Sequence, residues 1–189
     1  QTASSGAVNG AVLAAAGSAL TVARNTAFGT AVHSAGAFER KIGSYALSAS
    51  AAEGVNLNSF TILTSASSTN FQNMKVKVGT AQIGITQPTL TASASYTFNA
   101  APALNVPTGQ TKYLEVYADI LSNTTANVYA AATTLSNCSG SGATTFTSVS
   151  CTSTTGQDTR VAGQATVTIA LDNSAAPADH LVMNSTGNE

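Results

Sequence analysis

Lys112-Tyr-Leu-Glu-Val-Tyr-Ala-Asp-Ile120 decides the fold, because apolar and polar residues alternate through it without a break. In an extended chain, successive side chains point to opposite faces, so this period of two predicts a β-strand with one buried face. One face carries four apolar residues and the other carries tyrosines and carboxylates: Leu114, Val116, Ala118 and Ile120 against Tyr113, Glu115, Tyr117 and Asp119.

The same period recurs along the chain. Met74, Val76 and Val78 form an apolar row, Gly79-Thr80 supplies a turn, and Ile83 and Ile85 form the returning row of a predicted hairpin. Further strands are predicted at 19–24, 42–49, 55–64, 95–99, 127–133, 144–150 and 166–172. No helices separate them, so we expect an all-β, antiparallel sandwich of the immunoglobulin-like or jelly-roll type, with about nine or ten strands.

The composition excludes several classes of protein. The chain has 189 residues, 8% of them charged, and a net charge of −1. Nucleic acid is therefore not an expected partner. No apolar run approaches the roughly 18 residues of a membrane-spanning helix, so membrane insertion is not expected either. A surface coated by hydroxyls and amides instead of charges indicates a durable, secreted protein, located outside the cell or on its surface.

The two cysteines fit that location. Cys138 and Cys151 lie in a Ser/Thr/Gly-rich stretch, and no CxxC or histidine pattern suggests a metal or redox site. We predict a disulfide between them that pins a loop near one end of the sandwich. Three Asn-x-Ser/Thr sequons, at Asn123, Asn137 and Asn184, are candidate glycosylation sites.

The head and the tail of the chain resemble each other. An offset of 147 residues places Leu20-Thr-Val-Ala-Arg-Asn25 on Val167-Thr-Ile-Ala-Leu-Asp172, and it also places His33 on His180. We therefore predict an N-terminal arm at 1–18 and one sandwich domain at 19–189, whose terminal strand, at 164–180, repeats the first. Such a pattern is expected of a slice from a tandem array or of a polymer in which one strand completes a neighbouring domain.

The N-terminal segment is the candidate for that exchange. Residues 10–25 are apolar and thin, and a strand of this kind can pair with the exposed edge of another sheet. The polymerisation strand that we predict carries four apolar side chains: Val12, Leu13, Leu20 and Val22. The alternative is an ordinary first strand in the chain's own sandwich.

Four segments resemble, in order, parts of immunoglobulin-like repeat modules in large surface proteins of ultrasmall candidate-phylum bacteria. They are Ser44-Tyr-Ala-Leu to Phe60-Thr-Ile62, Met74-Lys-Val-Lys to Gly84, Pro107-Thr-Gly-Gln to Ile120, and Ile169-Ala-Leu-Asp-Asn-Ser-Ala-Ala-Pro177. The resemblance covers most of residues 17–189 and implies a secreted β-sandwich. It supplies no catalytic residues, and it leaves residues 1–16 unexplained.

Chemistry-bearing motifs are sparse. We predict no catalytic residues, no cofactor and no metal centre, because the sequence has no nucleophile elbow, phosphate loop or paired zinc ligands. His33 and His180 are interpreted as loop histidines. Calcium stays open as an alternative, with oxygen ligands from Asp119 and Asn123, or from Asp172-Asn173 and Asp179.

These observations favour a structural function. We expect a subunit of an extracellular filament or cell-surface array that assembles head to tail by β-strand donation, so that its partner is another copy of itself. The alternative is a secreted adhesin or carbohydrate-binding module that uses Tyr113 and Tyr117 as a stacking platform for surface glycans. A secreted hydrolase is the third and least supported interpretation.

Overall fold

The computed structural model describes residues 17–129 and 132–162, which form thirteen strands and one short 3-10 helix, η1. The alternating segments become long strands, because each has one apolar face to bury. The strands are β1 (Leu20–Arg24), β2 (Ala31–Ser34), β3 (Arg40–Ala49), β4 (Val55–Thr64), β5 (Phe71–Val78), β6 (Ala81–Thr89), β7 (Ser95–Val106), β8 (Thr111–Ile120), β9 (Asn127–Tyr129), β10 (Thr133–Gly142), β11 (Ser148–Val149), β12 (Thr154–Thr155) and β13 (Thr159–Ala162), with η1 at Ser68–Asn70.

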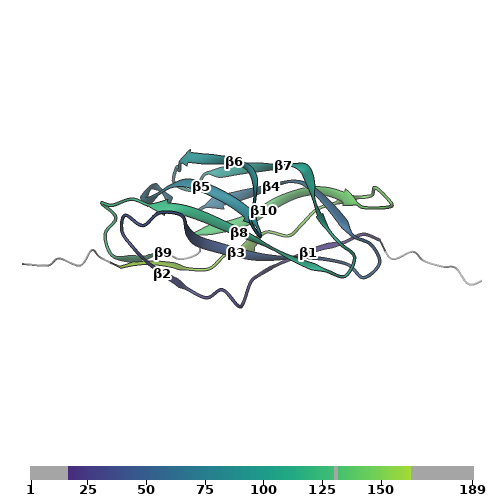
Figure 1. The fold of residues 1–189 in the computed structure, drawn as a ribbon, viewed down its shortest axis with the longest axis horizontal. Helices are drawn as coiled ribbons and strands as arrows, with labels where there is room; N and C mark the ends of the chain where they lie inside the picture. The colour runs from purple at the N-terminus through teal and green to yellow at the C-terminus, as the bar shows by residue number, and fades with distance from the viewer. Residues whose placement is uncertain (1–16, 130–131, 163–189) are drawn as a thin grey trace, which may run out of the picture.

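Two sheets form the sandwich (Figure 1). One has the strand order β1-β3-β8-β5-β6, and the other has the order β11-β10-β4-β7, with β12 paired to β10. A small third sheet, β2-β13-β9, includes the one parallel pair recorded among the described strands, β2 with β13. The prediction of an all-β antiparallel sandwich is confirmed.

The core lies between the two large sheets, and the row predicted from β8 faces it. Leu114, Val116, Ala118 and Ile120 are all buried. Val116 has register partners on both sides, Gly43 of β3 and Val76 of β5, so it lies at the centre of its sheet. The largest side chains with no appreciable exposure are Tyr45, Phe60, Phe98, Ile42, Leu47, Leu57, Ile62, Met74, Leu114 and Leu135.

A hydrogen bond also joins the two sheets through this core. The hydroxyl oxygens of Tyr45 on β3 and Thr133 on β10 lie 2.8 Å apart. Burial raises the pKa of Tyr45 far above its ordinary value, although the bond to Thr133 opposes that rise. The phenol therefore stays neutral and hydrogen-bonded, as a buried polar group must.

Several predicted strand boundaries were wrong. The segment 127–133 divides into β9 and the start of β10, and 144–150 is a turn followed by the two-residue strand β11. Ile85 does not face the core with Ile83 but is 75% exposed. The reason is a bulge in β6, where the register passes from Val76↔Ile83 to Met74↔Gln87 and Gly84 adopts a φ of 67°. The extra residues turn Ile85 outward.

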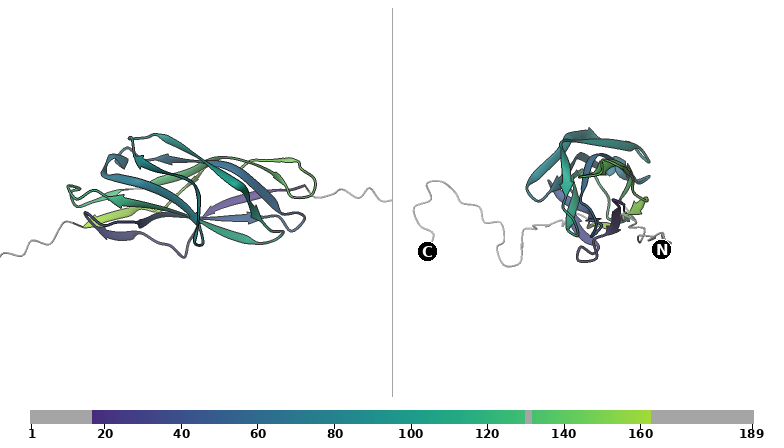
Figure 2. Two further views of the ribbon diagram at one scale, coloured as in Figure 1. Left: turned by 45° about the horizontal axis from the view of Figure 1, so that its top comes forward. Right: turned by 90° about the vertical axis from the view of Figure 1, so that its right-hand side faces the viewer.

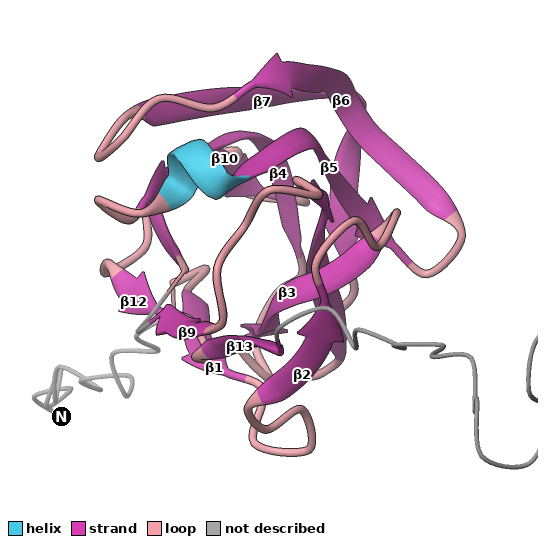
Figure 3. Ribbon diagram, turned by 90° about the vertical axis from the view of Figure 1, so that its left-hand side faces the viewer, coloured by secondary structure: helices cyan, strands magenta, loops and turns pink. Residues whose placement is uncertain are grey.

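The sandwich is elongated, and its described ends lie far apart. Figures 1 and 2 show the chain entering at one end, before β1, and leaving at the opposite end, after β13. We call these the N-terminal pole, which holds Gly17 and the turn between β10 and β11, and the C-terminal pole, which holds the sheet β2-β13-β9. Figure 3 views the molecule from the C-terminal pole, with β2, β13 and β9 on one side and β6 and β7 on the other.

Candidate functional site

The outer face of the five-stranded sheet carries an unusual share of the chain's few charges. We call it the charged face. It arises because β8 lies between β3 and β5, and the alternating polar residues of all three strands point outward. Across the pair of β5 and β8, Lys77 is the register partner of Glu115, and Lys75 is the register partner of Tyr117. The charged face consists of three lysines and three carboxylates: Lys41, Lys75, Lys77, Glu39, Glu115 and Asp119.

These charges pair with one another. The Lys41 ammonium lies 2.7 Å from Glu115 Oε1, and Lys77 pairs with Glu39, which Lys75 also approaches at 3.7 Å. The Tyr117 hydroxyl donates to Glu115 Oε2 at 2.8 Å, which orients that carboxylate further. The charged face is therefore close to neutral as a whole and does not form a one-signed field that would attract a highly charged partner.

Two carboxylates of the charged face, Glu39 and Glu115, have lowered pKa values and are not poised for proton transfer. A hydrogen bond from Lys77, helped by the charges of Lys75 and Lys77, lowers the pKa of Glu39. Burial acts to raise the pKa of Glu115, but hydrogen bonds from Lys41 and Tyr117 and the charge of Lys41 leave it below its ordinary value. A general acid or base works best with a pKa near the working pH, and neither carboxyl meets that condition.

Burial and the hydrogen bond to Glu115 raise the pKa of Tyr117 to about 12. The Lys77 ammonium lies 5.1 Å from the centre of the same ring, within the range of a cation–π contact. Tyr117 is thus part of the ionic network, whereas Tyr113, on the same face of β8, is half exposed. Tyr113 therefore presents more of its ring to solvent than Tyr117, which is partly buried and engaged by Glu115 and Lys77.

Asp119 holds two neighbouring segments together. Its Oδ1 accepts a hydrogen bond from the backbone N–H of Glu39 at 2.7 Å, and its Oδ2 accepts one from the side chain of Asn73 at 2.8 Å. Asn123, its proposed partner at a calcium site, is exposed beyond the end of β8. Among the described residues, no group of three or more His, Cys, Asp or Glu side chains could hold a metal ion.

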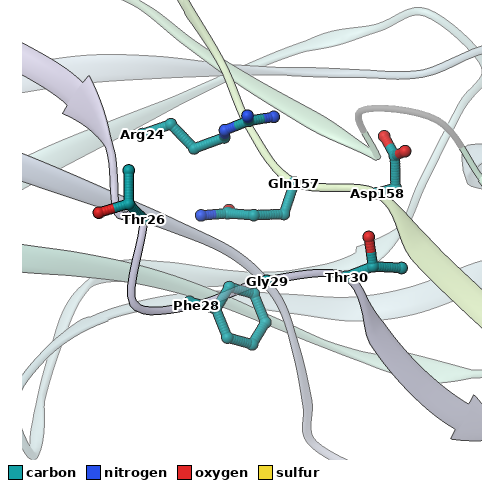
Figure 4. A pocket seen from close by; sticks show the side chains of 7 residues that line it. All are labelled: Arg24, Thr26, Phe28, Gly29, Thr30, Gln157 and Asp158. Atoms are coloured by element: carbon teal, nitrogen blue, oxygen red, sulfur yellow. The ribbon is translucent and has the colours of Figure 1, made fainter.

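A pocket lies where the end of β1 meets the segment before β13 (Figure 4). Its volume is about 250 Å³. The loop after β1 contributes Phe28, whose ring also lies 4.8 Å from the Lys41 ammonium, so the pocket adjoins the charged face. In Figure 4 the amide of Gln157 lies between the Arg24 guanidinium and the Phe28 ring. The residues that line the pocket are Arg24, Thr26, Phe28, Gly29, Thr30, Gln157 and Asp158.

Gln157 is bound to the backbone and is not available to a ligand. Its Oε1 accepts from the N–H of Ser44 at 2.9 Å, and its Nε2 donates to the carbonyls of Ser44 and Asn25 at 3.0 and 2.8 Å. The pocket thus offers one aromatic ring with a guanidinium, a carboxylate and two hydroxyls around it. This set can hold a small polar ligand.

The cysteine prediction is confirmed. Cys138 on β10 and Cys151, after β11, form a disulfide. Asn123 and Asn137 are exposed, as glycosylation would require, and Asn184 lies outside the described residues. The described residues contain no helix with the length and hydropathy needed to cross a membrane.

The predicted polymerisation strand divides into two parts. Leu20 and Val22 belong to β1, which pairs along its length with β3 of the same chain, and both side chains are buried in its core. For these two residues the expectation of a strand that docks elsewhere is corrected, because their apolar side chains already fill the chain's own sandwich. Val12 and Leu13 lie outside the described residues, as does the repeated strand at 164–180 with His180. The interpretation of His33 as a loop histidine is wrong: it lies on β2, and its Nε2 is 3.0 Å from the carbonyl oxygen of Lys41.

Two features were not predicted from the sequence: the small sheet at the C-terminal pole and the anchored turn at the N-terminal pole. In that turn the carboxylate of Glu53 accepts hydrogen bonds from the backbone N–H groups of Thr144 and Thr145 and from the Thr145 hydroxyl. These N–H bonds, that of Thr145 first, lower the pKa of Glu53. The signal in the sequence, a lone glutamate before Gly54, was too weak to identify this role.

No family model and no curated protein matches the sequence. Among solved structures, the seventh ScaB type I cohesin from Pseudobacteroides cellulosolvens is similar over 80% of this chain and 97% of that chain, with 15% sequence identity and a TM-score of 0.43. We infer no function from a likeness of this degree.

Proposed function

We propose that the chain is a structural subunit of an extracellular filament or cell-surface array, in which successive copies join head to tail. One observation carries this proposal: the described chain enters and leaves the sandwich at opposite ends of its long axis (Figure 1). A module with this geometry extends a linear assembly by its own length each time a copy is added. A contact between two different ends also propagates without closing, provided that the rotation between copies does not form a ring.

The surface and the covalent structure suit a durable extracellular role. The disulfide Cys138–Cys151 belongs to an oxidising compartment. The charged face is internally neutralised, so neighbouring copies would not repel one another strongly there. The disulfide and the neutral charged face support an extracellular location and a durable protein. The head-to-tail direction of assembly is inferred instead from the positions of the two poles.

Strand donation by the residues before Gly17, with Val12 and Leu13 as the apolar side chains, completes the proposal. The C-terminal pole offers acceptor edges, because β2 and β9 are the outer strands of the small sheet and contain no proline. By contrast, the edge strands β6 and β7 carry Pro88 and Pro102 together with bulges, features that discourage pairing with another strand.

Sedimentation velocity on the full chain and on a variant that lacks residues 1–16 tests the donation. The deletion removes none of the described strands. We expect the full chain to form larger species as its concentration rises, and the shortened chain to stay monomeric with an unchanged circular dichroism spectrum. Equal association of both proteins would contradict strand donation by this segment.

The pocket favours a second candidate function, the binding of a small polar ligand such as a sugar. An aromatic ring beside hydrogen-bonding side chains is a common arrangement for such ligands, and Phe28 supplies the ring. A glycan array probed with the wild-type chain and with Phe28→Ala tests this function. Binding that Phe28→Ala abolishes, in a chain that does not self-associate, would favour a carbohydrate-binding module over a filament subunit.

A further inference from the structure

The turn between β10 and β11 presents an aromatic side chain to solvent at the N-terminal pole. Phe146 is 76% exposed, and its backbone φ is 57°, a left-handed conformation that costs an aromatic residue free energy. A strained position of this kind in a native protein calls for an explanation, since glycine or asparagine would adopt the same backbone more easily. The ring contributes nothing visible to the chain's own core.

The rest of the turn is held firmly, so the backbone that carries the ring has a fixed position. The N–H of Phe146 donates to the carbonyl of Gly142 at 3.2 Å, and the N–H of Gly142 donates to the carbonyl of Thr147 at 2.9 Å. The Glu53 carboxylate binds the two residues before Phe146 and leaves no room for a Cβ at Gly142, which would lie 2.7 Å from its oxygens. The hydroxyls of Ser18 and Thr147 lie 2.7 Å apart, which places the turn beside the start of β1.

The C-terminal pole has a pocket whose chemistry suits an aromatic side chain. A pocket of about 320 Å³ is lined by residues of β9 and β13 and by the residue before β9. Val128, which is 52% exposed, and Ala162 give it apolar side chains, whereas the side chain of Val161 is buried in the chain's own core. Arg160 lies between Val32 and Val128 in the register of the small sheet, so a guanidinium adjoins the apolar surface.

We propose that Phe146 of one copy docks in this pocket of the next copy. The inference rests on the proposed function and names the contact between its two poles. The internal repeat supports the choice of a second copy as the occupant. With the offset of 147 residues, position 164 aligns with Gly17 in the sequence. Position 164 is only two residues after the pocket residue Ala162, so the repeat would start next to the pocket. A copy that begins there brings its own β10–β11 turn to the pocket, because that turn lies beside the start of β1.

The chemistry of the two surfaces is complementary. The ring would replace water against Val128 and Ala162, and the Arg160 guanidinium can lie over its face in a cation–π contact. One aromatic side chain buries roughly 150–250 Å², far less than the roughly 1,200 Å² or more that is typical of a stable interface. The contact therefore sets the orientation of copies that the strand exchange holds together.

Disulfide trapping in the full chain tests the contact. The two native cysteines are bonded to each other, so cysteines introduced at Phe146 and Val128 would be the only reactive thiols. Under mild oxidation, the double variant Phe146→Cys/Val128→Cys should give a ladder of dimers, trimers and longer species on a non-reducing gel. Each single variant can form no species larger than a dimer. Phe146→Cys/Ile85→Cys is the matched control: its second thiol lies on the side of the sandwich, where Ile85 is 75% exposed, and it should give about tenfold less oligomer.

A second variant separates assembly from stability. Phe146→Gly suits the left-handed backbone, so the melting temperature should stay the same or rise while the polymers in sedimentation become shorter. A loss of stability, with association unchanged, would assign Phe146 to the chain's own fold and overturn the proposal. In the dilute monomer of Val128→Cys, the introduced thiol should react readily with an alkylating reagent. Its protection there would also overturn the proposal, because the same chain would then fill the pocket.

The failure of this contact is distinguishable from the failure of the proposed function. If wild-type polymers form but the trapped ladder is no stronger than the control, the contact is wrong and head-to-tail assembly stands. If neither polymers nor a ladder appears at any concentration, both are wrong.

Discussion

The side-chain amide of Gln157 pairs with both backbone groups of Ser44, although the two residues are 113 positions apart. Gln157 accepts the N–H of Ser44 at 2.9 Å and donates to its carbonyl at 3.0 Å, as a neighbouring strand would do. It does so next to the end of β1 at Arg24, where the backbone N–H of Asn25 still donates to the same Ser44 carbonyl at 3.0 Å. Gln157 thus satisfies buried backbone groups beside the pocket and fixes the segment that leads to β13 and the C-terminal pole.

Replacing this amide should therefore destabilise the fold. Gln157 is 3% exposed, and Gln157→Ala leaves the N–H of Ser44 without its partner. We expect a loss of about 1–3 kcal/mol in the free energy of unfolding, measured by urea denaturation. Gln110→Ala, at an exposed turn position, is the control and should change the stability little. Equal midpoints for the two variants would show that the pairing with Ser44 contributes nothing.

The second prediction concerns which side chains of β8 face the core. Val116 is fully buried, whereas Val32 is 61% exposed, so the same substitution should change the stability of the fold strongly at Val116 and little at Val32. Val116→Asp places an unpaired carboxylate in the core and should cost several kcal/mol or prevent folding. Val32→Asp should be nearly silent. Thermal unfolding followed by circular dichroism measures both, and similar melting temperatures would contradict the assigned core.

The disulfide makes the third prediction. The bonded cysteines enclose a short loop, with a sequence separation of 13, and the chain-entropy estimate for such a loop is roughly 3 kcal/mol. The double variant Cys138→Ser/Cys151→Ser should lose stability of that order. Intact-mass measurement after alkylation without a reductant checks the bond itself: we expect no added mass, and two alkylated thiols would refute it.

The fourth prediction concerns acid stability. The N–H groups of Thr145 and Thr144 lower the pKa of Glu53 in the folded chain below its ordinary value of 4.5. A carboxyl whose pKa is lower when folded adds stability that is present above its unfolded pKa and is lost as the pH falls through the folded value. The melting temperature should therefore decline as the pH falls below about 5 and through the lowered pKa of Glu53.

Glu53→Gln isolates this contribution. The amide keeps the shape of the side chain but has no charge to titrate, so the variant should be less stable than the wild type near neutral pH and decline less steeply below about pH 5. Glu39→Gln is a useful comparison, because the pKa of Glu39 is also lowered but the group pairs with lysines on the charged face. If Glu53→Gln and the wild type decline in parallel, the Glu53 bonds do not contribute through its charge.

The sequence was sufficient where apolar residues alternate and insufficient where strands are short or rich in serine and glycine. β4, β5 and β8 were predicted because each has its own buried row, whereas β6, which has no fully buried residue, was predicted from its hairpin with β5. The middle and end of β10 read as a loop, since Ser139, Gly140 and Gly142 carry no strand signal. That segment is a strand because β4 pairs with it through a bulge, which is a tertiary effect.

The polar contacts that position the site could not be predicted for a related reason. β2, β9 and β13 have three or four residues each, and their pairing joins positions as distant as His33 and Val161. Gln157 and Glu53 are single polar residues whose roles depend on backbone groups brought to them by the fold. One exposed phenylalanine among threonines likewise gave no sign that its backbone is left-handed. Two parts of the site were accessible from the sequence: the disulfide, which follows from residue type and compartment, and the outward face of β8, which follows from the alternation.

Electron microscopy of the purified full chain tests head-to-tail assembly most directly. Negatively stained samples over a range of protein concentrations should show unbranched filaments one subunit wide, with the long axis of each sandwich along the filament. Phe146→Gly should shorten them, and deletion of residues 1–16 should abolish them. Single, separate particles of the wild-type chain at every concentration would contradict the account.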